Sequence, residues 1–324
     1  MTGFLLRRLA ASLLLLLLVL TLTFFILRLI PGDPIRLFEG QRLTLEQQQR
    51  LKRIYGLDRP LLEQYGVWLS SVALRADWGT SLSQQRPVSA ALMDALPATA
   101  VLASAALGVE YAAALLLGVA AARRRRTAVD HGIRVGSLLL YSQPPFWLGL
   151  MAILLFSYVW PILPAGHMHS VDSDLLSPAG RLLDLLRHLL LPALVMGLAT
   201  AGGTARFVRA NLLEVMGQDY IRAARAKGLS ELRVVWVHGM RNAAVPLIQL
   251  FSLSLPALLS GSLIIEVVFS WPGLGLLIFN AILTRDYPLI LGATSFSATL
   301  VILSNFAADL AHAWLDPLVR KEAA

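Results

Sequence analysis

The lysines and histidines are the first residues to consider for chemistry, because nucleotide and metal sites depend on them. A Walker A loop places Gly directly before Lys, so that backbone amides cradle phosphate. Here Lys52, Lys227 and Lys321 follow Leu, Ala and Arg. The "GHMH" stretch at 166–169 offers two imidazoles, fewer than the ligands of a zinc site, and a polar turn after Pro164 is the favoured interpretation. We expect no cofactor and no metal on this chain.

Serines inside apolar sequence raise a second possibility. An intramembrane serine protease needs a nucleophilic Ser and a His base within hydrogen-bond reach. Ser260 and Ser262 lie in an apolar stretch. His188 and His312, however, lie only near the ends of such stretches. We interpret both serines as small packing residues, and the lack of Cys excludes disulfides and thiolate metal sites.

Acids within apolar sequence are costly and often functional. Glu110 and Asp309 are the clearest examples. Asp309 lies near one end of its apolar stretch, where it can reach water. Glu110 is the better candidate, facing either an aqueous pathway or a partner on another helix.

Small residues are dense in "GLATAGGTARFVR", residues 197–209. Gly197, Ala201 and Ala205 recur every four residues, which lets two helix backbones approach closely in lipid. Pro192 and the pair Gly202 and Gly203 can also bend this helix and line a pathway. Close packing is the favoured interpretation, with the pathway as the alternative.

The elements that carry these residues follow from composition. The chain is 56% hydrophobic and 15% charged, with a mean hydropathy of +0.66, which indicates an all-α integral membrane protein. Six apolar stretches are long enough to cross a bilayer. They are Leu9–Ile30, Ala98–Ala122, Ile133–Val159, Leu189–Val208, Val245–Phe269 and Leu289–Trp314. The first resembles a signal peptide, but its length and the absence of a cleavage site predict an uncleaved span.

Three regions result: residues 1–30 with the first span, a polar segment 31–97 with one or two amphipathic helices broken at Pro60, and a five-span core 98–324. Short loops rich in Lys and Arg mark the cytoplasmic side. On one side lie Arg7, Arg8, Arg123–Arg126, Arg134, Arg206, Arg209, Arg222, Arg225, Lys227, Arg233, Arg241, Arg320 and Lys321. The short loops on the other side have Arg181, Arg187 and Arg285. Both termini and the loop 209–245 are therefore expected in the cytoplasm.

The net charge of +8 could indicate nucleic-acid binding. However, the basic residues cluster at the ends of apolar stretches, where membrane topology and anionic lipid account for them. We expect membrane lipid, and no nucleic acid, among the partners.

The stretch "DYIRAARAKGL", residues 219–229, is a short basic helix in that cytoplasmic loop. Asp219 is a plausible N-cap, and Gly228 supplies the left-handed position that ends a helix. The period of 3.6 residues places four residues on one face with two arginines beside it. These are Tyr220, Ala223, Ala224 and Lys227, flanked by Arg222 and Arg225.

This face favours docking to another protein, whose backbone the alanines admit and whose acids the arginines pair with. The alternative is a basic loop on anionic headgroups. A lipid-binding helix usually carries several large apolar residues, and only Ile221 and Leu229 are available. Protein docking is favoured.

At these residues the chain resembles the permease subunits of bacterial peptide/nickel-type ABC importers, especially the first of their two paired permeases. The stretch 219–248 is similar to that family's cytoplasmic signature, with Ala223, Ala224 and Gly228 at its Ala-Ala and Gly positions. Arg222 replaces the Glu of the general signature, and Pro246 comes later than usual. Both departures match the peptide-type subfamily.

Further stretches resemble the family's sequence blocks in the expected order. They are "LIPGDP" at 29–34, "YGLDRPLLEQYGVWL" at 55–69, "DWGTS" at 77–81, "PPFWLGL" at 144–150, "EVVFSWPGLG" at 266–275 and "RDYP" at 285–288. One block would be weak evidence, but the ordered set covers nearly the whole chain.

The resemblance implies a type I importer permease fold and a mechanism. A homologous second permease would complete the pathway, two cytosolic ATPases would bind ATP and Mg, and an external solute-binding protein would deliver substrate. The helix 220–227 would enter a groove on an ATPase. The segment 31–97 and the loop of Trp271, Pro272, Gly273 and Gly275 would contact the second permease or the binding protein. A tight turn, or a membrane-surface anchor at Trp271, is the alternative for that loop.

Two other function classes stay open. A secondary transporter would need no ATPase, but such proteins are often built from internal repeats, and we find none. A membrane scaffold would need no docking loop. The substrate itself, whether dipeptide, oligopeptide, glutathione or nickel complex, is not decided by these residues.

Overall fold

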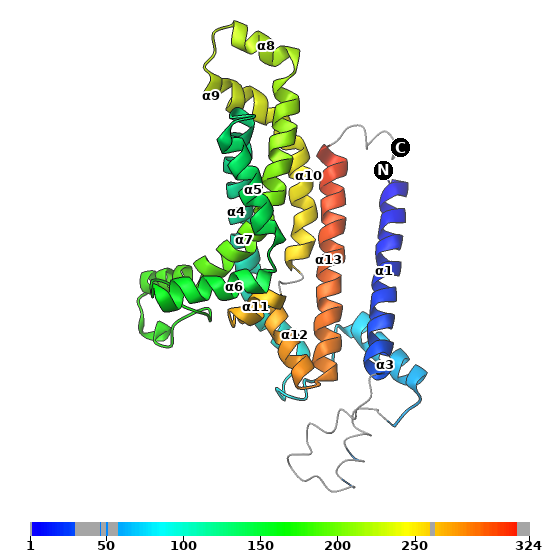
Figure 1. Ribbon diagram of the computed structural model, residues 1–324. Helices are drawn as coiled ribbons and strands as arrows, with labels where there is room; N and C mark the ends of the chain where they lie inside the picture. Colours follow the sequence, from blue (N-terminus) through cyan, green and yellow to red (C-terminus); the bar gives the residue numbers. More distant parts are fainter. Residues whose placement is uncertain (1, 30–45, 47–49, 51–57, 260–262, 316–324) are drawn as a thin grey trace. The chain divides into compact units, whose positions relative to one another are not determined.

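The computed structural model describes residues 2–29, 46, 50, 58–259 and 263–315 (Figure 1). The described chain is helical, apart from turns and one isolated bridge between Thr80 and Pro87. The chain forms two compact units. The first contains residues 1–99, 259–263 and 272–324, and the second contains residues 100–258 and 264–271.

The helices of the described chain are α1 (Thr2–Leu29), α3 (Leu61–Arg75), α4 (Val88–Arg123), α5 (Ala128–Ser142), α6 (Pro145–Ile153), α7 (Pro178–Met216), α8 (Asp219–Ala226), α9 (Glu231–Arg233), α10 (Met240–Leu259), α11 (Leu263–Val268), α12 (Leu274–Leu283) and α13 (Tyr287–Leu315). Two π-helical turns, Leu154–Val159 and Val234–Gly239, follow α6 and α9, and a 3-10 turn covers Ser173–Leu175.

In the first unit, α1 and α13 lie side by side (Figure 1). The amphipathic helix α3 begins after Pro60, as the sequence predicts, and packs aromatic rings against α1. Phe24 lies 5.4 Å from Tyr65 and 5.3 Å from Trp68 between ring centroids. The other predicted amphipathic helix, before Pro60, lies almost entirely outside the described residues.

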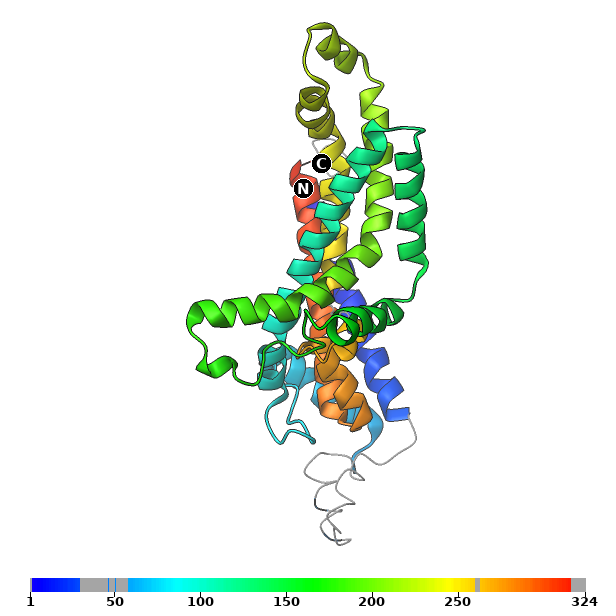
Figure 2. The same cartoon turned by 60° about the vertical axis from the view of Figure 1, so that its left-hand side comes forward.

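The second unit is organised around α7, which packs against α5 and α6. Figure 2 shows that α7 bends along its length, and Pro192 lies inside it. A Pro inside a helix removes one backbone hydrogen bond and crowds the preceding turn. The predicted bend of this helix is therefore present.

Close backbone contact joins α4 to α7. A Cβ atom added at Gly118 would lie 2.6 Å from Cβ of Val208, and one added at Gly197 would lie 2.6 Å from the carbonyl oxygen of Ala106. Ala205, also on α7, is 2% exposed at this contact. The small residues thus let the two helix backbones come into contact. In lipid, burying apolar side chains gives little driving force for association, so dispersion contacts between closely packed helices must hold them together.

The predicted spans need corrections. Ala98–Ala122 and Leu189–Val208 lie within helices of 36 and 39 residues. The predicted single span Ile133–Val159 is instead broken by 99° between α5 and α6, because Pro144 cannot donate a backbone hydrogen bond. Within the predicted span Val245–Phe269, the structure describes α10 up to Leu259 and α11 from Leu263, and residues 260–262 lie outside the described chain.

Four helices of the described chain are long and apolar enough to cross a membrane, or five when the bent pair counts as one span. The first and last predicted spans correspond to α1 and α13. The predicted number of six is therefore not confirmed. In addition, α4 begins at Val88, so ten residues assigned to the polar segment belong to this helix.

Substituting Gly118 by Val should loosen the contact between α4 and α7. The new side chain would overlap Val208, and overpacking of this kind costs about 1–3 kcal/mol. We expect a lower midpoint of thermal unfolding in detergent for Gly118→Val. Gly108→Ala on the same helix is the matched control, because no atom lies within 4 Å of its added Cβ. Equal midpoints for Gly118→Val and the wild type would contradict the packing role.

Candidate functional site

The candidate site is the loop that joins α7 to α10. It holds α8 and α9, and the predicted helix 220–227 corresponds closely to α8, Asp219–Ala226. Gln218, not Asp219, occupies the N-cap position and makes no side-chain cap bond. Gly228 has a φ of +79°, which confirms the predicted left-handed residue after the helix.

One face of α8 packs against the chain itself. Ile221 is 0% exposed and Ala224 is 7% exposed. They form a small cluster with Val234, against which Met216 and Leu229 also pack. Ala224, which the sequence placed on the same docking face as Ala223, is therefore covered in this structure, and its role in ATPase coupling stays a prediction. Positions one residue apart differ by about 100° around a helix, and the chain's own apolar residues cover Ala224.

The rest of the α8 surface is exposed, as is the C-cap residue Lys227. The exposed residues include Tyr220, Arg222 and Ala223. The hydroxyl of Tyr220 accepts a 2.7 Å hydrogen bond from Nδ2 of Asn242, which ties this surface to the start of α10. The exposed surface is thus basic, small at Ala223, and held in place by its own chain.

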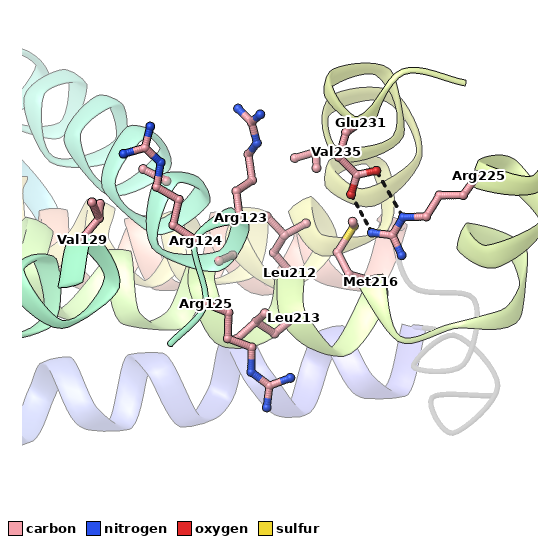
Figure 3. A pocket seen from close by; sticks show the side chains of 12 residues that line it. Arg123, Arg124, Arg125, Val129, Leu212, Leu213, Met216, Arg225, Glu231 and Val235 are labelled. Atoms are coloured by element: carbon pink, nitrogen blue, oxygen red, sulfur yellow. Dashed lines mark hydrogen bonds and ion pairs between the residues drawn. The ribbon is translucent and has the colours of Figure 1, made fainter. Parts of the chain in front are cut away.

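Arg225 makes a contact within the loop that the sequence did not predict, and its role in ATPase coupling stays a prediction. Its Nε and Nη2 donate to the two carboxylate oxygens of Glu231 at 3.1 and 2.7 Å (Figure 3). The hydrogen bonds from Arg225 lower the pKa of Glu231, and the hydrogen bond to Glu231 raises the pKa of Arg225. This fork holds α8 to α9, so Arg225 stabilises the loop instead of presenting a free charge. The sequence signal was an acid six residues after Arg225.

The pathway candidates lie in the second unit. The buried carboxylate of Glu110 accepts a 2.7 Å hydrogen bond from Oγ1 of Thr204 on α7. This confirms the interhelical partner that the sequence left as one alternative. Gly202 is buried, and a Cβ there would lie 2.6 Å from the carbonyl oxygen of Ser137, which indicates close packing of α7 on α5. Gly203 is half-buried near Tyr141. That these residues line a pathway stays a prediction.

A second interaction across the helices was missed by the sequence reading. Asp130 is buried and accepts two 2.8 Å hydrogen bonds from Nε and Nη2 of Arg209. Its carboxylate also accepts from the backbone amide of Arg126. The available signal was that Asp130 is the single acid among the arginines of residues 123–134. An acid surrounded by arginines is expected to form a charge-assisted hydrogen bond with one of them.

The predicted external contacts are mostly buried. Trp271 is 0% exposed, and its amide donates to the carbonyl oxygen of Glu266 at 2.8 Å. Gly273 and Gly275 are also buried, whereas Pro272 is exposed. Trp271 is therefore a packing residue, and a role as a membrane-surface anchor does not fit its burial. Partner contact by this loop stays a prediction that rests on Pro272.

Two of the sequence blocks noted above are joined by side-chain hydrogen bonds in the first unit. Oδ2 of the fully buried Asp286, in "RDYP", accepts hydrogen bonds from Oγ of Ser81 at 2.6 Å and from Oγ of Ser83 at 2.7 Å. A Cβ added at Gly292 would lie 3.1 Å from Cβ of Trp78, in "DWGTS". Burial of a charge is compensated by several hydrogen bonds. These blocks therefore have a structural role in the fold.

The "GHMH" stretch is held by hydrogen bonds. The amide of His167 donates to the carbonyl oxygen of Phe269 at 2.8 Å, and Nδ1 of His169 lies 3.1 Å from Oδ2 of Asp184. Across the described residues, no group of three or more His, Cys, Asp or Glu has the arrangement of a metal site. The stretch is thus an ordered turn.

Several apolar helices long enough to span a bilayer, together with a helical loop that exposes basic residues, define a multi-pass membrane protein. The family models agree. The chain belongs to the inner membrane components of binding-protein-dependent transport systems: that model matches residues 114–321, and the model of their N-terminal part matches residues 1–103. It is therefore a multi-pass inner membrane protein of a transport system.

Curated relatives are similar over nearly the whole chain. The di/tripeptide transport system permease protein of Pseudomonas aeruginosa is 39% identical over 337 residues, covering 99% of this chain and 100% of the relative. The oligopeptide transport system permease protein of Bacillus subtilis is 36% identical, covering 98% and 99%. The dipeptide transport system permease protein of Escherichia coli K12 is 34% identical, covering 99% of each.

Replacing Glu231 by Gln should loosen α8 from α9, because an amide keeps the shape but loses the charge that pairs with Arg225. The lowered pKa of Glu231 means that this stabilisation is fully present above the ordinary value of 4.5 and is lost as the pH falls through the folded-state value. The protection factors of the amides in residues 219–233 should therefore fall in Glu231→Gln by the same ratio at every pH from 6 to 8. A ratio that changes with pH in this range would contradict the assignment.

Proposed function

We propose that this chain is one of the two permeases of an ATP-driven importer of di- or oligopeptides. Its match to peptide permeases over at least 98% of its length is the observation that carries the proposal. A homologous second permease completes the translocation pathway, and an external solute-binding protein delivers the peptide. Both termini lie in the cytoplasm, as the arginine-rich loops predict.

Two cytosolic ATPases, which carry ATP and Mg, drive this permease through the exposed face of α8. Support comes from its geometry: Tyr220, Ala223 and Lys227 are exposed, while Ile221 and Ala224 hold the helix to its own loop. A helix that is anchored on one face and open on the other can transmit motion. Closure of the ATPase pair would then shift the spans between inward-facing and outward-facing states.

The test should change the exposed face without disturbing the buried one. An Asp at position 224 would place a charge in the small apolar cluster and would unfold the helix for reasons unrelated to docking. An Asp at position 228 would sit at a φ that side chains rarely adopt. Position 223 is the better choice, since Ala223 is exposed.

Ala223→Asp should reduce peptide uptake and recovery of the ATPases on the affinity-tagged permease by about tenfold or more, because an unpaired carboxylate would be buried on docking. Ala210→Asp, at an exposed position of α7 outside α8, is the matched control and should retain both. Normal uptake together with normal ATPase recovery in Ala223→Asp would rule out docking through this face.

Transport assays with the permease reconstituted in vesicles distinguish the proposed importer from the two other function classes. A secondary transporter would move peptide into vesicles without the ATPases, and a membrane scaffold would move none in any assembly. The proposed importer should instead hydrolyse ATP faster when the binding protein carries peptide. Selectivity among dipeptides, oligopeptides, glutathione and nickel complexes is expected to reside in that binding protein.

A further inference from the structure

A pocket of about 570 Å³ lies in the second unit beside α8 (Figure 3). The ends of α4 and α7, the start of α5, and α8 with α9 contribute to it. One part of its lining is apolar, with Val129, Leu213 and Met216. The other part carries Arg123, Arg124, Arg125 and Arg225. Such a site suits a ligand with an anionic group joined to an apolar chain.

The charge of the pocket is positive. Within the part of the chain that the structure describes, Arg225 neutralises Glu231, the acid of the lining, through the two-bond fork. Arg123, Arg124 and Arg125 are exposed. The charge of Arg123 contributes to the lowered pKa of Glu231, but the direct hydrogen bonds of that acid go to Arg225. Figure 3 shows that Arg123 and Arg124 point to the same side, whereas Arg125 points to the opposite side. Two guanidinium groups on one side can bind one phosphate group.

The depth of the pocket in the membrane follows from α4. This helix is apolar enough to span a bilayer, and it ends at Arg123. A charged cluster directly after a span lies at the level of the lipid headgroups, whichever side of the membrane it faces. Phospholipid phosphates are therefore present at high local concentration beside Arg123 and Arg124.

We propose that this pocket binds one anionic phospholipid, with its phosphate between Arg123 and Arg124 and the start of an acyl chain against Ala120 and Val129, the apolar lining residues on the membrane side of the arginines. Guanidinium groups donate several hydrogen bonds to phosphate in a fixed geometry. Basic pockets between membrane helices are suited to anionic headgroups. An acidic protein segment would use the arginines but leave the apolar lining uncovered.

Bound lipid would also contact the loop that carries α8, because Arg225 and Glu231 line the same pocket. The lipid would thus stabilise the orientation of α8 relative to the ends of α4 and α7. This consequence makes the loop sensitive to membrane composition. The inference does not depend on the proposed function.

The full-length chain, purified in detergent and exchanged into nanodiscs, allows a direct test. Nanodiscs of phosphatidylcholine with a small fraction of fluorescent phosphatidylglycerol should give saturable energy transfer from a donor attached to the loop at residue 230. Arg123→Gln/Arg124→Gln should weaken this binding about tenfold or more, because each arginine contributes to attraction of the headgroup. Fluorescent phosphatidylcholine should give no saturable transfer.

Arg233→Gln/Arg241→Gln is the matched control, since it removes two exposed positive charges outside the pocket lining. It should bind phosphatidylglycerol as the wild type does, and an equal loss would show unspecific surface attraction and overturn the site. Displacement by millimolar inorganic phosphate would show an ion site and overturn the lipid assignment. Displacement by an acidic peptide but not by unlabelled phosphatidylglycerol would indicate a protein-docking site instead. Val129→Asn, which makes the apolar lining polar without adding a charge, should also weaken lipid binding while leaving Arg123 and Arg124 in place.

Discussion

Close approach of α4 and α7 is the contact on which the second unit depends. Gly118 and Gly197 lie where the opposing helix leaves no room for a side chain. In lipid, helices gain little from burying apolar surface, so close backbone contact and interhelical hydrogen bonds must supply the attraction. The buried hydrogen bond between Glu110 and Thr204 lies in the same interface. With α4 and α7 held together, their ends also position the arginines at residues 123–125 beside the loop of α8.

The loop of α8 shows how a short helix can be both anchored and exposed. Eight residues form few backbone hydrogen bonds and would be marginal alone. Ile221 and Ala224 bury one face against the loop, and the fork of Arg225 and Glu231 fixes the helix end. Its remaining face stays open for a partner. The proposed recognition would thus use a part of the helix surface that its own packing leaves exposed, and the same loop borders the arginine-rich pocket.

Sequence reasoning found the membrane class, most of the long helices, α8 and its terminal Gly228, because composition, apolar length and capping are local properties. It failed for features that depend on contacts between residues far apart in the sequence. The break at Pro144 was read as part of one span, because apolar length does not report a bend. For the loop of Trp271 the sequence left a partner contact, a tight turn and a membrane-surface anchor open, and the side chain of Trp271 is fully buried. The hydrogen bond between Asp286 and Ser81 joins residues about two hundred positions apart, so no local sequence pattern predicts it.

By itself the sequence determined that this protein is an α-helical membrane permease with a basic helical loop, since hydrophobic length, charge distribution and ordered motifs are written along the chain. Only the tertiary structure decided which residues of that loop are available. Ala223 and Ala224 are neighbours of the same type, yet one is exposed and the other is covered by Val234 and its neighbours. Arg222 and Arg225 likewise carry the same charge, but Arg225 is held by two hydrogen bonds to Glu231, whereas Arg222 makes one exposed ion pair with Asp219 at 3.3 Å. The physical reason is that accessibility depends on what packs against a face, and that packing comes from residues elsewhere in the chain.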